Sequence, residues 1–120
     1  MIIAVPVDEN KIEICPSFAR TPYYMFYNMQ TNNCDVIENP AAQAEGGAGI
    51  KAAQFIIDNK ADVLITPRCG ENAAEILKEA EMKIYKSEGN NATENINKFK
   101  ENKLSELTKF HAGFHGIKWK

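Results

Sequence analysis

Two short stretches of the chain combine residue types that hold anions with a potentially reactive thiol. The first contains three glycines, Gly46, Gly47 and Gly49, directly before a helical apolar pattern. The second, residues 66–73, places a cysteine and a glycine before another such pattern. A helix N-terminus carries unpaired N–H groups and the positive end of the helix dipole. The sequence therefore predicts one anion site at which both stretches meet, for a metal-containing ligand.

Cys69 is the candidate metal ligand of the second stretch. A thiol at a helix N-terminus has a lowered pKa, and a basic neighbour such as Arg68 acts in the same direction. The thiolate is the form that binds metals. In the alternative interpretation Cys69 is a small buried side chain, as free cysteines often are. Cys15 follows the first predicted strand and reaches the same site only if its loop folds over that sheet edge, whereas Cys34 is interpreted as structural.

Two histidines near the end of the chain, His111 and His115, are further candidate metal ligands. Their spacing of four would place both imidazoles on one face of a helix. Gly113 and Gly116 disfavour a helix there, so chelation would need a folded loop and a third ligand. We expect residues 1–110 to form one α/β domain and residues 111–120 a mobile C-terminal tail.

The glycine-containing stretch has a second, competing interpretation. Residues 47–52 read GAGIKA, which matches the G-x-G-x-x-A pattern of dinucleotide-binding folds. That fingerprint follows the first strand directly, whereas these glycines follow a hairpin and a loop, and no acid for a ribose ends the next strand. Lys51 lacks the following Ser or Thr of a P-loop. The glycines therefore either allow a tight turn and close helix packing or present amides to a ligand.

Composition excludes several classes of function. The 120 residues suffice for one domain, and 44% hydrophobic with 25% charged residues is ordinary for a globular protein. A net charge of −2 gives no indication of nucleic-acid binding. No stretch approaches the eighteen apolar residues of a membrane span, and the start does not resemble a signal peptide. Three cysteines without a close pair favour a reducing compartment, which predicts a cytoplasmic protein.

Five short apolar segments predict the strands of one sheet, at residues 2–7, 23–29, 34–38, 63–65 and 82–85. The second and third form a hairpin, whereas the first, fourth and fifth alternate with helices in the order that gives parallel strands. We therefore predict an α/β fold with a mixed five-stranded sheet, the antiparallel hairpin at one edge. Ligands of such sheets bind beyond the carboxyl ends of the parallel strands, where both turns are expected.

Three helices are predicted from apolar residues at helical spacing. The second begins at Asn72, which together with Glu75 has the form of a capping box. The third covers residues 92–103. The first begins at Ala48, and its apolar face is expected to contain Ile50, Ala53, Phe55, Ile56 and Ile57.

Over nearly its whole length the sequence resembles the nitrogenase iron–molybdenum cofactor accessory proteins. The matching motifs are IIAVPV at residues 2–7, FARTPY at 18–23, GGAGI at 46–50, and DVLIT at 62–66 with GENA at 70–73. The resemblance implies a ribonuclease-H-like three-layer fold. It also implies non-catalytic binding of an iron–sulfur or iron–molybdenum cluster, or of its precursor.

One departure from this family concerns a ligand. The family commonly reads His-Phe-Gly-Arg where this chain has Ser17, Phe18, Ala19 and Arg20. Serine is a poor ligand for soft metals. Either Cys15 takes over this role or the chain does not bind the family's cluster, whereas the retained Arg20 suits an anionic ligand.

The first hypothesis is therefore a carrier of a metal–sulfur cluster that works with cluster donor and acceptor proteins. Cys69 and Cys15 would be thiolate ligands, with His111 or His115 as an outer ligand. The second hypothesis is an interaction or regulatory module that binds a phosphate or nucleotide at the same turns. An enzyme is not expected, because no acid–base or nucleophile–base pair can be named. The remaining candidate binding residues are Arg20, Gly46, Gly47, Gly49, Gly70 and Asn72.

Overall fold

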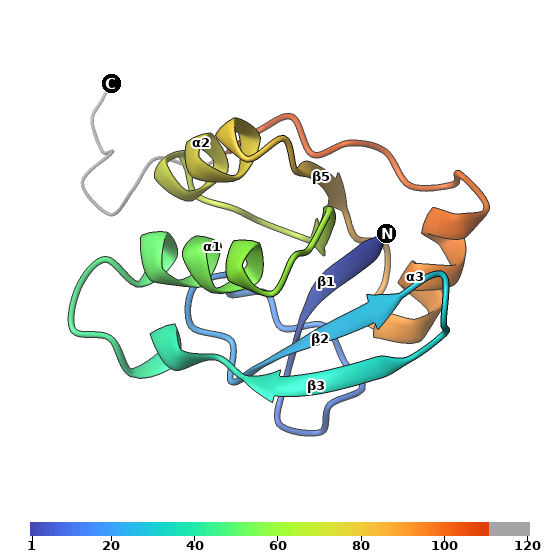
Figure 1. Ribbon diagram of the computed structural model, residues 1–120, viewed down its shortest axis with the longest axis horizontal. Helices are drawn as coiled ribbons and strands as arrows, with labels where there is room; N and C mark the ends of the chain where they lie inside the picture. The colour runs from blue at the N-terminus through green and yellow to red at the C-terminus, as the bar shows by residue number, and fades with distance from the viewer. Residues whose placement is uncertain (111–120) are drawn as a thin grey trace.

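A five-stranded mixed sheet in the order β3-β2-β1-β4-β5 forms the centre of the protein (Figure 1). The structure is a computed structural model that describes residues 1–110. The predicted α/β fold with one mixed five-stranded sheet is confirmed. His111, His115 and the expected tail lie outside the described residues.

The central strand, β1 (Ile2–Val7), connects the antiparallel and parallel halves of the sheet. It pairs antiparallel with β2 (Tyr23–Asn28), which pairs antiparallel with β3 (Cys34–Glu38). On its other side β1 pairs parallel with β4 (Val63–Thr66), and β4 pairs parallel with β5 (Lys83–Lys86). The hairpin at one edge and the parallel strands at the other are therefore as predicted.

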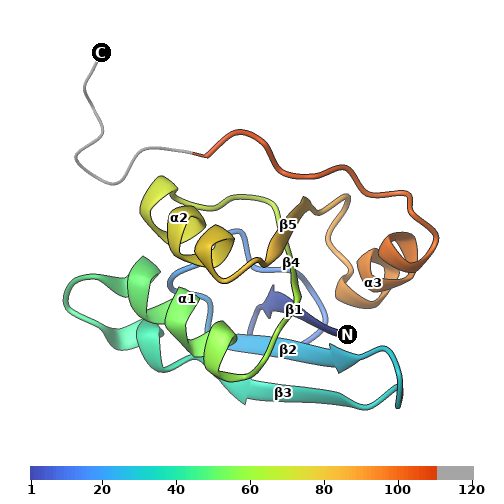
Figure 2. The same ribbon diagram turned by 45° about the horizontal axis from the view of Figure 1, so that its top comes forward.

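The helices cover both faces of the sheet. Helices α1 (Ala48–Asp58) and α2 (Glu71–Glu79) lie together on one face, and α3 (Ala92–Lys100) lies on the other (Figure 2). A short 3-10 helix, η1 (Pro40–Gln43), precedes α1. The molecule therefore has three layers, with the sheet in the middle.

Two hydrophobic cores follow from the alternation of side chains along the strands. In β1, Ala4 faces the α1 and α2 side, whereas Ile3 and Val5 face the α3 side. Because both faces are covered, β1 is a continuous apolar run rather than an alternating one. This double burial agrees with the position of β1 at the centre of the sheet, whereas the edge strands β3 and β5 contain exposed charged residues.

The expected start of α2 is wrong. The helix begins at Glu71 after Gly70, and Asn72 lies in its first turn without capping it. The buried residues of α2 are Ala73, Ala74 and Leu77, and half-buried Gly70, three residues before Ala73, is the N-cap, so the buried face of the helix agrees with the earlier start. The predicted apolar face of α1 is also too wide, because Ile50 is 48% exposed.

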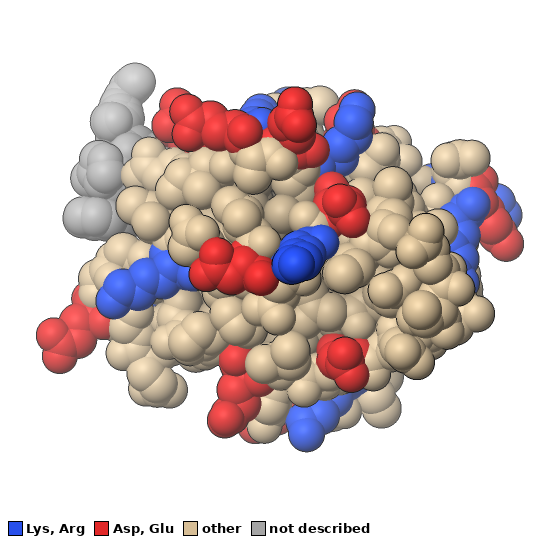
Figure 3. Space-filling model, viewed as in Figure 1, with Lys and Arg blue, Asp and Glu red and all other residues tan. Residues whose placement is uncertain are grey.

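Charged side chains are interspersed on the face that Figure 3 shows, without a large area of one sign. This distribution differs from the concentrated basic surface that nucleic-acid binding requires. Among the helices of residues 1–110, none combines the length and apolar character needed to span a membrane.

Candidate functional site

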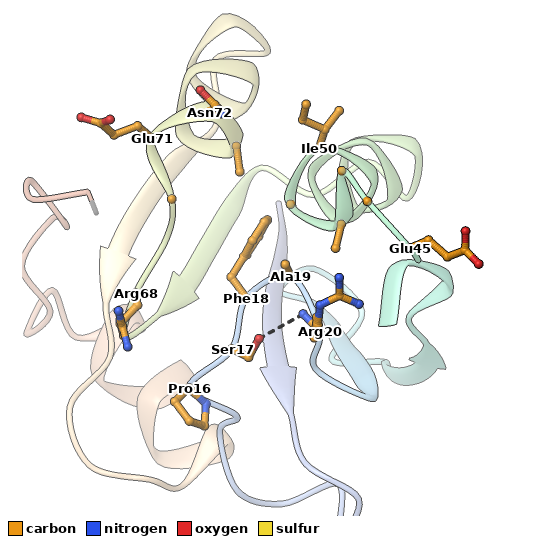
Figure 4. A pocket seen from close by; sticks show the side chains of 16 residues that line it. Pro16, Ser17, Phe18, Ala19, Arg20, Glu45, Ile50, Arg68, Glu71 and Asn72 are labelled. Atoms are coloured by element: carbon orange, nitrogen blue, oxygen red, sulfur yellow. Dashed lines mark hydrogen bonds between the residues drawn. The ribbon is translucent and has the colours of Figure 1, made fainter. Parts of the chain in front are cut away.

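The two turns singled out from the sequence line one pocket of about 840 Å³. Its wall is built from the loop after β1 (residues 16–20), the turn before α1 (residues 45–50) and the start of α2 (Figure 4). All three segments leave the sheet at the same end of its strands. The loop after β1 and the start of α2 emerge together because β1 and β4 are parallel. The chain after β3 returns to that end because Tyr23 pairs both with Val7 at the end of β1 and with Glu38 at the end of β3. The predicted convergence of the turns is therefore confirmed.

Close contact between the two helix starts holds the pocket together. A Cβ atom placed on Gly49 of α1 would lie 3.8 Å from the Cβ of Ala73 in α2, which is van der Waals distance. Phe18 is buried and lies between the two helix starts (Figure 4). Small residues thus bring the N-termini of α1 and α2 side by side above an aromatic ring.

Both helices at the pocket begin without a side-chain cap. Gly47, the residue before α1, has a left-handed φ of 66°, and Gly70 precedes α2 with extended backbone. Outside this site the N-termini are capped: the Asn91 side chain accepts a hydrogen bond from Glu94 N at the start of α3, and Asn39 accepts one from Ala41 N at the start of η1. The uncapped N–H groups of the first turns of α1 and α2 are therefore concentrated at the pocket.

Two arginines add positive charge to these N–H groups. Arg20 and Arg68 line the pocket from opposite walls. Within residues 1–110, the salt bridges join other residues, so neither guanidinium is neutralised by a carboxylate. Glu45 and Glu71 also belong to the lining, but Figure 4 shows their carboxylates directed away from the cavity. The pocket interior is therefore suited to an anion.

Arg20 also contributes to the shape of the pocket wall. Its Nη1 donates to Ala42 O at 3.2 Å and to Ala44 O at 2.9 Å. Its backbone N–H donates to the hydroxyl of Ser17 at 3.1 Å (dashed in Figure 4). Ser17, the residue that replaces the family histidine, therefore closes the loop around Arg20 and itself lines the pocket.

All six residues predicted to bind the ligand through charge or backbone line this pocket, and their role in binding stays a prediction. Phe18, and Arg68 in its own right, were not identified as pocket residues from the sequence. The signal was present, since Phe18 belongs to the motif at residues 18–23 and Arg68 to the stretch at residues 66–73. The six predicted residues are Arg20, Gly46, Gly47, Gly49, Gly70 and Asn72.

The predicted lowering of the Cys69 pKa is wrong. The side chain is fully buried, and this desolvation raises the pKa of the thiol from 9.0 to about 12, although the charge of Lys78 acts in the opposite direction. The thiol donates to Gly70 O at 3.6 Å and does not line the pocket. Loss of hydration outweighs the helix dipole here, so Cys69 is a protonated core residue at neutral pH.

The other predicted metal ligands do not complete a metal site in the described part of the chain. Cys15 is buried, its pKa is raised by desolvation, and it does not line the pocket although Ser17 does. Cys34, which was not predicted to be a ligand, is a free, exposed cysteine on β3. Among residues 1–110, no three His, Cys, Asp or Glu side chains come close enough to hold a metal ion.

Comparisons with known proteins agree with this architecture. The model of the dinitrogenase iron–molybdenum cofactor family matches residues 1–102. A Thermotoga protein provisionally assigned as NifB is 36% identical, with a TM-score of 0.75 over 91% of this chain and 95% of that one. The apo form of the orange protein from Desulfovibrio gigas shares the fold with a TM-score of 0.82 at 24% identity, over 89% of this chain and 92% of that one.

A third solved structure extends this likeness to archaea. A Methanocaldococcus jannaschii protein provisionally assigned as a dinitrogenase has a TM-score of 0.73 at 20% identity, over 91% of this chain and 96% of that one. No curated protein matches the sequence significantly.

The two pocket glycines should respond differently to alanine. Gly47→Ala places a Cβ on a left-handed residue and should lower the free energy of unfolding by about 1 kcal/mol. Gly49→Ala makes only the 3.8 Å contact with Ala73 and should leave stability unchanged or raise it by up to ~1 kcal/mol. Urea unfolding of both variants measures the difference, and equal destabilisation would contradict the structure.

Burial of Cys69 should make the protein less stable at alkaline pH. The unfolded thiol loses its proton near 9.0, whereas the folded one keeps it up to about 12, so the unfolded state binds fewer protons in between. The free energy of unfolding should therefore fall as pH rises above about 9, by up to ~1.4 kcal/mol per pH unit from this group.

Cys69→Ala should flatten this decline, and unfolding at several pH values between about 9 and about 10 tests it, below the ordinary pKa of tyrosine. Cys34→Ala is the comparison: partial burial and Asp35 also raise the pKa of that thiol, but less than burial raises that of Cys69, so it should flatten the decline less. An unchanged pH dependence in Cys69→Ala would show that the thiol already ionises in the folded protein.

Proposed function

Because the chain belongs to the dinitrogenase iron–molybdenum cofactor family, we propose that its pocket carries a metal–sulfur cluster, or the precursor of one, without catalysing a reaction on it. The family match covers residues 1–102, which include every segment of the pocket wall. The cluster is cargo in this function, taken from a donor protein and passed to an acceptor protein.

The observation that carries this proposal is the meeting of two uncapped helix N-termini and two arginines in one pocket. Backbone N–H groups and guanidinium groups donate hydrogen bonds to anions. These hydrogen bonds are stronger when the acceptor is charged than when it is neutral. Sulfide and oxide atoms on the outside of an anionic cluster are such acceptors. Phe18 and the small residues beside it offer an apolar surface for the rest of the cluster.

The donor set determines how such a cargo would be held. Soft metals prefer thiolate or imidazole ligands, and the described pocket wall contains neither. A bond to Cys69 or Cys15 would require a buried, protonated thiol to leave the core, so neither cysteine is proposed as a ligand. The cargo therefore keeps its own ligands and is bound through its outer atoms, with His111 or His115 proposed as an additional outer ligand.

Other features agree with this function. The three cysteines are free, which is compatible with the proposed reducing, cytoplasmic location. The layer order of the molecule is compatible with the ribonuclease-H-like classification that the resemblance implies. The alternative ligand, a phosphate or nucleotide, would use the same N–H groups, and the experiment must separate it from a metal–sulfur anion.

Tetrathiomolybdate is a suitable probe, because it is a compact anion of molybdenum and sulfide. Binding is measured anaerobically by visible absorption and by thermal unfolding, with molybdate, inorganic phosphate and ATP in parallel. We expect tetrathiomolybdate to stabilise the protein most, by about 2.7 kcal/mol at about 100 times its dissociation constant. Stabilisation by phosphate or ATP alone would instead support the alternative, and no stabilisation by any probe would contradict both.

Arg68→Ala tests whether the pocket is the binding site. Loss of one charge-assisted hydrogen bond should raise the dissociation constant of tetrathiomolybdate about tenfold. Lys83→Ala is the matched control, because it also removes one positive charge. Lys83 is the first residue of β5, at the end of the parallel strands opposite the pocket, and does not line the pocket. Equal effects of the two substitutions would show that overall charge, and not the pocket, governs binding.

A further inference from the structure

Two of the three segments that form the pocket wall lie far apart in the chain. One is the loop after β1, and the other is the turn that leads from η1 into α1. Their separation decides whether Arg20 and the uncapped N–H groups of α1 reach one ligand together. A residue that forms hydrogen bonds with both segments would therefore affect binding without touching the ligand.

Asn39, at the end of β3, joins them. It is 5% exposed and does not line the pocket. Its Nδ2 donates to Ala19 O and to Thr21 O, both at 3.0 Å, which holds the loop. Its Oδ1 accepts from Ala41 N at 3.0 Å, which starts η1. Both functional groups of this buried amide are thus used, one on the loop after β1 and one on η1, which leads into the turn before α1.

Neighbouring contacts turn this link into a rigid frame. The Thr21 hydroxyl donates to Val7 O at 2.8 Å, and the Tyr24 hydroxyl donates to Phe18 O, so the loop is fixed to the sheet. Arg20 of the same loop makes a second link, because its Nη1 donates across to Ala42 O and Ala44 O. Asn39 and Arg20 thus link the loop to η1 at two points, and Asn39 is the buried link that does not line the pocket.

We propose that Asn39 is a positioning residue for cargo binding: it sets the spacing between Arg20 and the glycine turn. The inference rests on the proposed function of the pocket. Without the Asn39 amide, the carbonyls of Ala19 and Thr21 lose their donor and the loop can shift relative to η1. The expected result is weaker binding, in the way that loss of an orienting residue around a metal site weakens affinity.

Asn39→Ser is the most informative substitution. Serine can still accept the hydrogen bond from Ala41 N and cap η1, but it is too short to reach the two loop carbonyls. The dissociation constant of tetrathiomolybdate should rise roughly tenfold or more. Asn39→Ala, which also removes the cap, should weaken binding at least as much.

Asn95→Ser is the matched control for stability. Asn95 is also a buried asparagine with three side-chain hydrogen bonds to backbone, from Nδ2 to Glu88 O and Asn91 O and to Oδ1 from Glu88 N. It lies in α3, on the face of the sheet opposite α1 and α2. This variant should lose comparable stability but change the dissociation constant less than twofold, a difference small beside the tenfold effect of about 1.4 kcal/mol.

A readout without ligand keeps this inference separate from the proposed function. In ¹⁵N-labelled protein, the amide resonances of Gly46 and Gly47 should move in Asn39→Ser and stay in place in Asn95→Ser. Unmoved glycine resonances, or equal loss of affinity in both variants, would overturn the positioning role. If the wild-type protein binds no tetrathiomolybdate but the glycine resonances move in Asn39→Ser, the proposed function is wrong, whereas the structural role of Asn39 in positioning the glycine turn is supported.

Discussion

The parallel pairing of β1 with β4 is the constraint on which the site depends. It aligns Ile3 with Val63 and Ala4 with Leu64, so both strands end at the same edge of the sheet. The loop after β1 and the start of α2 after β4 must then emerge side by side. Because the hairpin of β2 and β3 returns the chain to that same edge, the turn before α1 joins them. The pocket is thus a consequence of sheet topology, and its chemistry comes from the residues placed in three loops.

Within this sheet topology, burial and helix electrostatics act on different chemical groups. The dipoles and uncapped N–H groups of α1 and α2 are exposed to the pocket, where an anion can use them. Cys69, one residue before the N-cap of α2, faces the core instead, and desolvation controls its protonation. The same turn therefore offers a positive surface outward and an inert thiol inward. This separation explains why a site that looks like a thiolate centre in the sequence is built as an anion pocket.

The sequence predicted the fold better than the site. The mixed sheet with a hairpin at one edge followed from the apolar runs and the hairpin turn, and the glycine turns marked the pocket. The direction of individual side chains was not predictable in the same way. Whether Cys69 points inward depends on where α2 begins, and the Asn72 capping pattern placed that start too late. The hydrogen bonds of Asn39 could not be predicted from the sequence either, because its partners Ala19 and Thr21 are about twenty residues away in the chain.

A map of backbone amide resonances during titration with tetrathiomolybdate tests the central claim most directly. We predict that the perturbed amides belong to the first turns of α1 and α2, including Gly49 and Asn72, and to the loop around Arg20. The capped first turn of α3 should not respond. Perturbations centred on α3 or on the edge strand β3, with the first turns of α1 and α2 unaffected, would contradict the assignment of this pocket as the anion site.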